Sequence, residues 1–199
     1  MDVIFIYDKS NSMQKEEVLS EQANIETMII QFNKTLNKPD NGDGGRKKLK
    51  VGVISFGCYS RAEVNLTYDL SEAIQLVNNS GIETTGCTRT DLALGDYIQM
   101  MNSDHARNHS NKVAVLMSDG SVCCKPAYLT NALNLASNIK EDNETILSVY
   151  VNNNPSDDTA DEMWQFSSCS KDSTGSVSDD ADCLYYFDGT FDELTASSG

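Results

Sequence analysis

Along the chain, segments whose apolar residues have the spacing of a strand alternate with segments whose apolar residues have the spacing of a helix. An apolar run of strand length spans residues 2–7 and ends at Asp8, which predicts a strand buried on both faces. Residues 62–67 alternate apolar with polar after a turn at 57–60, which predicts a hairpin with the strand before the turn. We expect strands at 2–7, 49–56, 62–67, 113–117, 145–151 and 184–187.

Helical spacing separates these strands. Apolar residues recur every three or four positions from Val18 to Leu36, and a loop with Pro39 and three glycines follows at 37–48. Further helices are expected at 71–77 with Ser71 as cap, at 90–101, from Pro126 to Ile139 and at 160–168. The apolar face of the helix at 90–101 is expected to hold Leu92, Leu94, Tyr97 and Met101.

Strands that alternate with helices predict the fold class. We expect an α/β domain with a doubly wound, mostly parallel central sheet flanked by helices. Ligands of such sheets bind beyond the carboxyl ends of the strands, where Asp8 and Asp119 are expected to lie. At 199 residues the chain is expected to form one domain over 1–195, with 196–199 as tail or linker.

The composition argues against two classes of function, nucleic-acid binding and membrane insertion. The formal net charge of −15 argues against nucleic acid, whose binding depends on cationic contacts to phosphates. Such a charge either serves solubility or fits an ion-rich extracellular setting where repulsion is screened. No apolar stretch has transmembrane length, so no direct membrane insertion is expected.

Cysteines and glycosylation sequons favour a secreted protein. Six cysteines, an even number, suggest an oxidising compartment. Their spacing is not C-x-x-C, which argues against a structural zinc site. Five acceptor sequons point the same way, at Asn33, Asn65, Asn78, Asn108 and Asn143.

Three segments carry the candidate chemistry. They are Asp8-Lys-Ser10-Asn-Ser12, then the loop 84–91 (TTGCTRTD), then residues 116–120 (LMSDG). Oxygen-bearing side chains at alternate positions past a strand suit a hard divalent cation. Taken singly, the first motif could instead cap the next helix and the third could be a turn.

Together, and in this order, the three segments resemble the metal-ion-dependent adhesion site of von Willebrand factor type A domains. The resemblance covers nearly the whole chain and implies a Rossmann-like fold. It implies that Ser10, Ser12 and Thr88 ligate the metal directly, while Asp8 and Asp119 act through waters or behind the ligands. The ion would be Mg²⁺, or Mn²⁺ or Ca²⁺, since all accept oxygen. Neutral hydroxyl ligands leave the ion positive, so a partner carboxylate can complete its coordination.

The chain departs from the family pattern in two places. Lys9 and Asn11 stand where the family often has glycine, so Lys9 either opposes the metal or points to solvent. Of the family's final helix, which moves in members that switch affinity, only 191–194 is present. We therefore expect either that this domain does not switch affinity or that the helix lies outside the given sequence.

The resemblance also implies a disulfide arrangement. Cys169 and Cys183 flank one loop and form the natural pair, at the end of the sheet opposite the metal. Cys58, Cys87, Cys123 and Cys124 would lie near the metal, and three pairings of these four stay open. A bond from Cys87 to Cys123 or Cys124 is favoured over free buried thiols.

The expected function is extracellular adhesion or matrix binding through a divalent cation completed by a partner's Asp or Glu carboxylate. One alternative is a structural subunit of a matrix or filament, with a structural or degenerate metal site. Another is a cytoplasmic type A domain in a multiprotein complex. Enzyme functions fit less well, because no phosphate loop or Ser–His motif is present, and His105 and His109 are expected to be surface residues.

Overall fold

The fold is a central sheet between two layers of helices. A computed structural model describes residues 1–36, 49–120, 122, 125–151, 160–169 and 186–189. The elements in chain order are β1 (Asp2–Asp8), α1 (Lys15–Leu36), β2 (Lys50–Phe56), β3 (Ser60–Thr67), α2 (Leu70–Asn79), α3 (Thr90–Met101), β4 (Lys112–Ser118), α4 (Pro126–Glu141), β5 (Thr145–Val151), α5 (Ala160–Phe166) and β6 (Tyr186–Gly189).

The six described strands follow the order β3-β2-β1-β4-β5-β6. All neighbours pair in parallel except β2 and β3, which form the antiparallel hairpin expected from the alternating pattern. The predicted α/β class with a mostly parallel, doubly wound sheet is therefore confirmed. Because β1 and β4 are parallel neighbours, Asp8 and the residues just after β4 lie at the same edge of the sheet.

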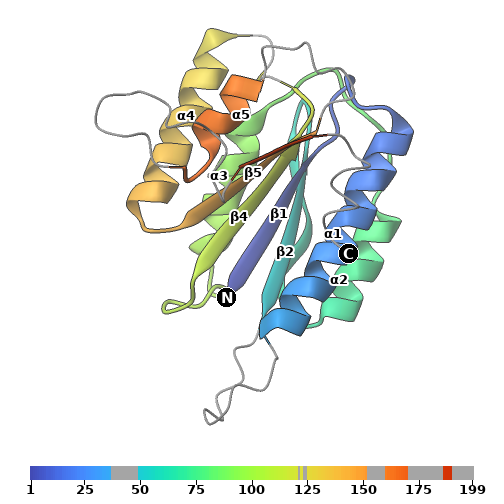
Figure 1. Ribbon diagram of the computed structural model, residues 1–199, viewed down its shortest axis with the longest axis vertical. Helices are drawn as coiled ribbons and strands as arrows, with labels where there is room; N and C mark the ends of the chain where they lie inside the picture. The colour runs from blue at the N-terminus through green and yellow to red at the C-terminus, as the bar shows by residue number, and fades with distance from the viewer. Residues whose placement is uncertain (37–48, 121, 123–124, 152–159, 170–185, 190–199) are drawn as a thin grey trace.

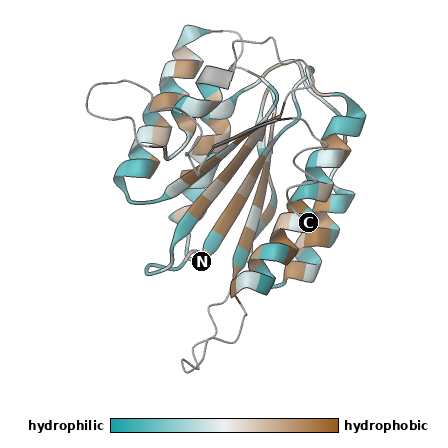
Figure 2. Cartoon of the chain, in the orientation of Figure 1, coloured by the Kyte–Doolittle hydropathy of each residue, from teal (hydrophilic) through white to brown (hydrophobic). Residues whose placement is uncertain are grey.

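Alternate residues of the central strand serve the two layers. Val3, Phe5 and Tyr7 pack with α1 and α2, whereas Ile4 and Ile6 pack with α3, α4 and α5. Figure 1 shows α1 and α2 on one side of the sheet and α3, α4 and α5 on the other. The two-sided burial explains why β1 is apolar at consecutive positions, and Figure 2 shows the same apolar character along the inner strands.

Two local expectations were wrong. Asp69, not Ser71, caps α2, because its side chain accepts a hydrogen bond from the backbone N–H of Glu72 at 2.9 Å. Leu92 is 36% exposed, because the buried face of α3 turns through Ala93, Leu94 and Tyr97 instead.

Element ends differ slightly elsewhere. The helix expected at 160–168 ends at Phe166, and the last strand, expected at 184–187, is described as Tyr186–Gly189. The predicted loop at 37–48 and the remnant of a final helix at 191–194 lie outside the described residues.

Asp2 and Arg107 form a buried ion pair at the amino end of the sheet. Asp2 begins β1 and is fully buried. The Arg107 side chain donates to Asp2 Oδ1 from Nε at 2.7 Å and from Nη2 at 2.5 Å, and its backbone N–H donates to Oδ2 at 2.9 Å. Burial on its own would raise the pKa of Asp2, but the hydrogen bonds and charge of Arg107 outweigh it and hold that pKa below its usual range.

Candidate metal centre

Asp8 anchors the site at the carboxyl end of β1. Its carboxylate is fully buried and accepts two short hydrogen bonds. The backbone N–H of Ser10 donates to Oδ1 at 2.7 Å, and the Ser118 hydroxyl donates to Oδ2 at 2.6 Å. These bonds fix the turn after β1 against the end of β4.

A chain of polar contacts then crosses from this turn to Asp119. The Ser10 and Ser12 hydroxyls lie 2.7 Å apart, and Ser12 donates to Asp119 Oδ1 at 2.9 Å. Ser10 is buried, whereas Ser12 is exposed. The hydroxyls and carboxylates expected from the first and third motifs therefore gather at one place that opens to solvent.

The loop with Thr88 lies against the same turn. The backbone N–H of Thr85 donates to the Lys9 carbonyl at 2.7 Å, and Ser10 and Thr85 form an isolated parallel bridge. Thr88 follows three residues later, is 5% exposed and leads directly into α3. The structure thus places all three predicted segments side by side.

The electrostatics of the site are strongly acidic. Burial raises the pKa of Asp8 to about 7; the Ser118 hydrogen bond opposes this, and the negative charge of Asp119 adds to it. Burial also raises the pKa of Glu21 well above its ordinary value, and the charges of Asp8 and Asp119 reinforce that effect.

Glu21 forms no ion pair within the part of the chain that the structure describes. The backbone N–H of Asp8 lies near enough to oppose the rise of its pKa slightly. Even so, neither carboxyl oxygen makes a hydrogen bond of standard geometry within the described residues. A divalent cation beside Asp8 and Asp119 would offset the repulsion among these acids.

Comparisons with known proteins fit this geometry. The sequence model of the von Willebrand factor type A domain matches residues 2–197. The chain belongs to this family.

Solved structures support the same fold for this type A domain. Proximal thread matrix protein 1 from the mussel byssus is 16% identical, with a TM-score of 0.74 over 99% of this chain and 46% of that chain. The von Willebrand factor domain of the type V pili tip protein Mfa5 from Porphyromonas gingivalis is 12% identical, with a TM-score of 0.73 over 99% of this chain and 92% of that chain. Manganese-loaded TRAP protein from Plasmodium vivax is 16% identical, with a TM-score of 0.69 over 98% and 70%.

The chain spans less than half the length of the mussel byssus protein. A further structure of that protein has a zinc-occupied adhesion-site motif. The search of curated protein sequences found no match.

The donor set of this type A domain fits a hard divalent cation. Among the described residues no cluster of three His, Cys, Asp or Glu side chains could hold a metal. An ion here would depend on hydroxyl oxygens together with Asp8 and Asp119, which suits an ion that prefers oxygen and keeps waters. Asp8 is completely buried beside this group of hydroxyls, and a cation bound there would compensate its negative charge.

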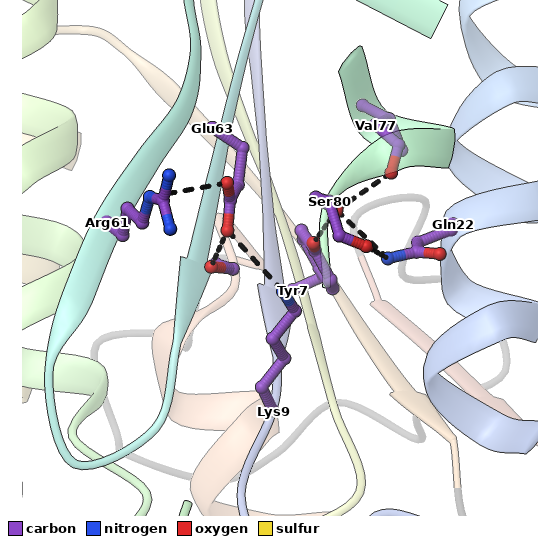
Figure 3. A network of polar contacts seen from close by, with 8 residues as sticks. Tyr7, Lys9, Gln22, Arg61, Glu63, Val77 and Ser80 are labelled. Carbon is purple, nitrogen blue, oxygen red and sulfur yellow. Dashed lines mark hydrogen bonds and ion pairs between the residues drawn. The ribbon is translucent and has the colours of Figure 1, made fainter. Parts of the chain in front are cut away.

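The Lys9 side chain is directed toward Glu63 (Figure 3). Its ammonium lies 3.4 Å from Glu63 on β3, and Glu63 also accepts from the Ser55 hydroxyl at 2.7 Å. Since β3 lies two strands from β1 in the direction away from β4, the charge of Lys9 is directed away from Asp119. The ammonium is also 5.3 Å from the centre of the Tyr7 ring. The departure from glycine at this position is therefore accommodated by an ion pair.

The sequence alone did not indicate that Ser118 and Glu21 belong to the site. Ser118 could have been found from strand register, because Tyr7 pairs with Met117 and the next residue on each strand is Asp8 and Ser118. Glu21 gave no signal, because a glutamate within α1 looks like a solvent-exposed helical residue.

The cysteines only partly follow the expected arrangement. Cys169 is disulfide-bonded, and its predicted partner Cys183 lies outside the described residues, as do Cys123 and Cys124. The expected bond from Cys87 to Cys123 or Cys124 is wrong for this structure, since Cys58 and Cys87 are both free thiols. The reason is that the loop of Cys87 packs on the β2–β3 turn, where the backbone N–H of Cys58 donates to Thr85 Oγ1 at 2.7 Å.

Most of the remaining candidates are exposed. The sequon residues Asn65, Asn78, Asn108 and Asn143 are exposed, and Asn33 on α1 is half-buried. His105 and His109 are also exposed, in agreement with the surface assignment. No helix in the described part of the chain is both long and apolar enough to cross a membrane.

Proposed function

We propose that this type A domain binds a protein partner through a divalent cation held by Ser10, Ser12 and Thr88, with Asp8 and Asp119 behind them. Mg²⁺ is the preferred ion, and Mn²⁺ or Ca²⁺ would serve. The partner supplies an Asp or Glu carboxylate, so the domain acts in adhesion or matrix binding and not as an enzyme. Its setting is extracellular, with sugars on some of the five sequons.

The observation that carries this proposal is the placement of Asp8. A fully buried carboxylate whose pKa is raised to about 7 lies beside a second acid and two hydroxyls. A cation would favour the ionised form of Asp8 and reduce its repulsion with Asp119. Because the hydroxyls contribute no charge, the bound ion would stay attractive to a carboxylate even on a chain with a net charge of −15.

Charges at the rim support an acidic partner. Arg89 follows Thr88 directly, forms two hydrogen bonds with Asp91 at 2.7 and 2.8 Å, and stacks 3.7 Å from the centre of the Tyr128 ring. Lys125 lies 5.7 Å from the centre of the same ring. Since Asp91 balances the charge of Arg89, Lys125 is the cation of this group that would add a local attraction for a carboxylate near the ion.

A structural subunit of an extracellular matrix or filament is the second candidate. It is favoured by the likeness to the mussel byssus matrix protein and to a pili tip protein, each over 99% of this chain. In this case the metal would be structural or absent.

Calorimetric titration of Mg²⁺ into the chelator-treated protein tests the proposal. We expect one site in the wild type, loss of binding in Ser10→Ala, and no change in Ser71→Ala, an exposed serine on α2. Acidic peptides that bind in Mg²⁺ should then lose binding when their Glu is replaced by Gln. Absence of Mg²⁺ binding to the wild type would refute the cation-dependent function and favour the structural subunit.

A further inference from the structure

Two loops beside the metal site are joined by their backbones. The backbone N–H of Arg89 donates to the Gly57 carbonyl at 3.0 Å, and that of Cys58 donates to Thr85 Oγ1 at 2.7 Å. A side chain at Gly57 would place its Cβ 2.0 Å from Thr85 Oγ1, so the close approach requires glycine there. The β2–β3 turn and the loop with Thr88 are therefore held in fixed proximity.

Each of these loops carries one free thiol. Cys58 follows Gly57 in the turn, and Cys87 precedes Thr88 in the loop. Both side chains are half-exposed, so a small disulfide can reach them. Cys58 itself donates the bond to Thr85, and Cys87 lies between Thr85 and Arg89, the two residues of its loop that bond the turn, so the two thiols belong to directly adjoining segments.

The same chain already carries a disulfide. Cys169 is disulfide-bonded, and disulfides persist in oxidising compartments such as the extracellular setting proposed above. Two thiols on loops that are already held together need only a local adjustment of these loops to reach the bonding distance of about 2 Å.

We propose that Cys58 and Cys87 form a reversible disulfide that ties the loop of Thr88 to the β2–β3 turn. A small disulfide such as oxidised glutathione is the oxidant. The thiolate of one cysteine attacks it and releases one reduced glutathione; the second cysteine then attacks the protein-side sulfur and releases another. The two protons lost by the cysteines go to the two released thiols.

The bond would act on the metal site through Thr88, the next residue after Cys87. Tethering Cys87 reduces the freedom of the loop that presents the Thr88 hydroxyl, so the oxidised protein should bind a divalent cation more tightly. This effect on the metal rests on the function proposed above, whereas formation of the bond itself does not.

Peptide mapping tests the bond. The full chain is incubated with oxidised glutathione, remaining thiols are blocked with N-ethylmaleimide, and a non-reducing digest is examined by mass spectrometry. We expect a peptide pair joined through Cys58 and Cys87, and in Cys58→Ser a mixed disulfide of glutathione at Cys87. A link from Cys87 to Cys123 or Cys124, or full alkylation of both thiols after oxidation, would overturn the proposal.

Metal titration tests the consequence. Mn²⁺ affinity is measured on the oxidised and mildly reduced wild type, with the Cys58→Ser, Cys87→Ser double variant as control for any reduction at Cys169. We expect affinity at least about threefold tighter in the oxidised wild type, and no redox effect in the control. Equal affinities would overturn the tether, whereas absence of Mn²⁺ binding in both redox states would instead refute the proposed function while the peptide map still decides the bond.

Discussion

Buried carboxylates at the two ends of the central sheet differ in whether basic side chains compensate their charge. At the amino end, Asp2 is enclosed by Arg107, and Glu144 accepts from Lys112 at 2.9 Å and from the Tyr97 hydroxyl at 2.8 Å. At the carboxyl end, the neighbours of the buried Asp8 are hydroxyls, a backbone N–H and other acids.

The difference separates stability from function. A buried carboxylate next to an arginine is compensated inside the chain, and its lowered pKa shows that folding favours the charged form. A buried carboxylate with a raised pKa is a cost to the folded state until something from outside neutralises it. At the carboxyl end, a cation from outside would compensate the charge of Asp8. At the amino end, Arg107 already compensates the charge of Asp2, and this pair stabilises the fold.

The largest effect is expected at the amino end. Arg107→Ala would leave Asp2 buried without its partner, which typically costs about 3 kcal/mol or more. The free energy of unfolding from urea titration at pH 7 measures this loss. Arg61→Ala is the matched control, because the Arg61 side chain is 71% exposed and its pair with Glu63 is long at 3.5 Å. The control should cost less than about 1 kcal/mol; equal losses would contradict the contrast between a closed pair and a surface pair.

An intermediate effect is expected at the carboxyl end, and only with metal present. With chelator, Asp119→Ala should unfold at the wild-type urea concentration or slightly above it, since an acid that repels Asp8 is removed. With Mg²⁺ at a hundred times its dissociation constant, the wild type should gain about 2.7 kcal/mol and the variant nothing.

Asp104→Ala, an exposed acid in the loop after α3, is the control for that measurement. It should keep the full gain from Mg²⁺. Stabilisation of Asp119→Ala by Mg²⁺ to the wild-type extent would show that the cation binds elsewhere.

The sequence predicts most of the fold because its patterns are local. The helix at Thr90–Met101 and the strand at Thr145–Val151 have the expected bounds, since periodicity and flanking residues suffice to define them. The cap of α2 was misplaced because Ser71 and Asp69 are both good capping residues, and only geometry selects Asp69.

The site divides along the same line. Asp8, Ser10 and Ser12 are close in sequence, and Asp119 ends a neighbouring parallel strand, so their meeting was predictable. The direction of Lys9 was not, because it depends on Glu63, which is 54 residues away on a strand that does not pair with β1. The proximity of the loops that carry Cys58 and Cys87 likewise depends on how these loops pack.

Glu21 provides the smallest and most specific test of the contrast. Its folded pKa is raised, so the native state holds a proton at pH values above the ordinary 4.5, where the unfolded chain has lost it. The contribution of Glu21 to the free energy of unfolding therefore falls as pH rises above that value. Glu21→Gln removes this slope while keeping the shape, and with chelator at pH 8 it should stabilise the protein by about 1 kcal/mol, with no gain near pH 4.

Asp2→Asn should behave in the opposite sense, because a lowered folded pKa adds stability above the ordinary 3.8 and loses it as pH falls. Urea titrations across this pH range measure both variants; parallel profiles for Glu21→Gln and the wild type would show that Glu21 is compensated after all, and that the two ends of the sheet do not differ as described.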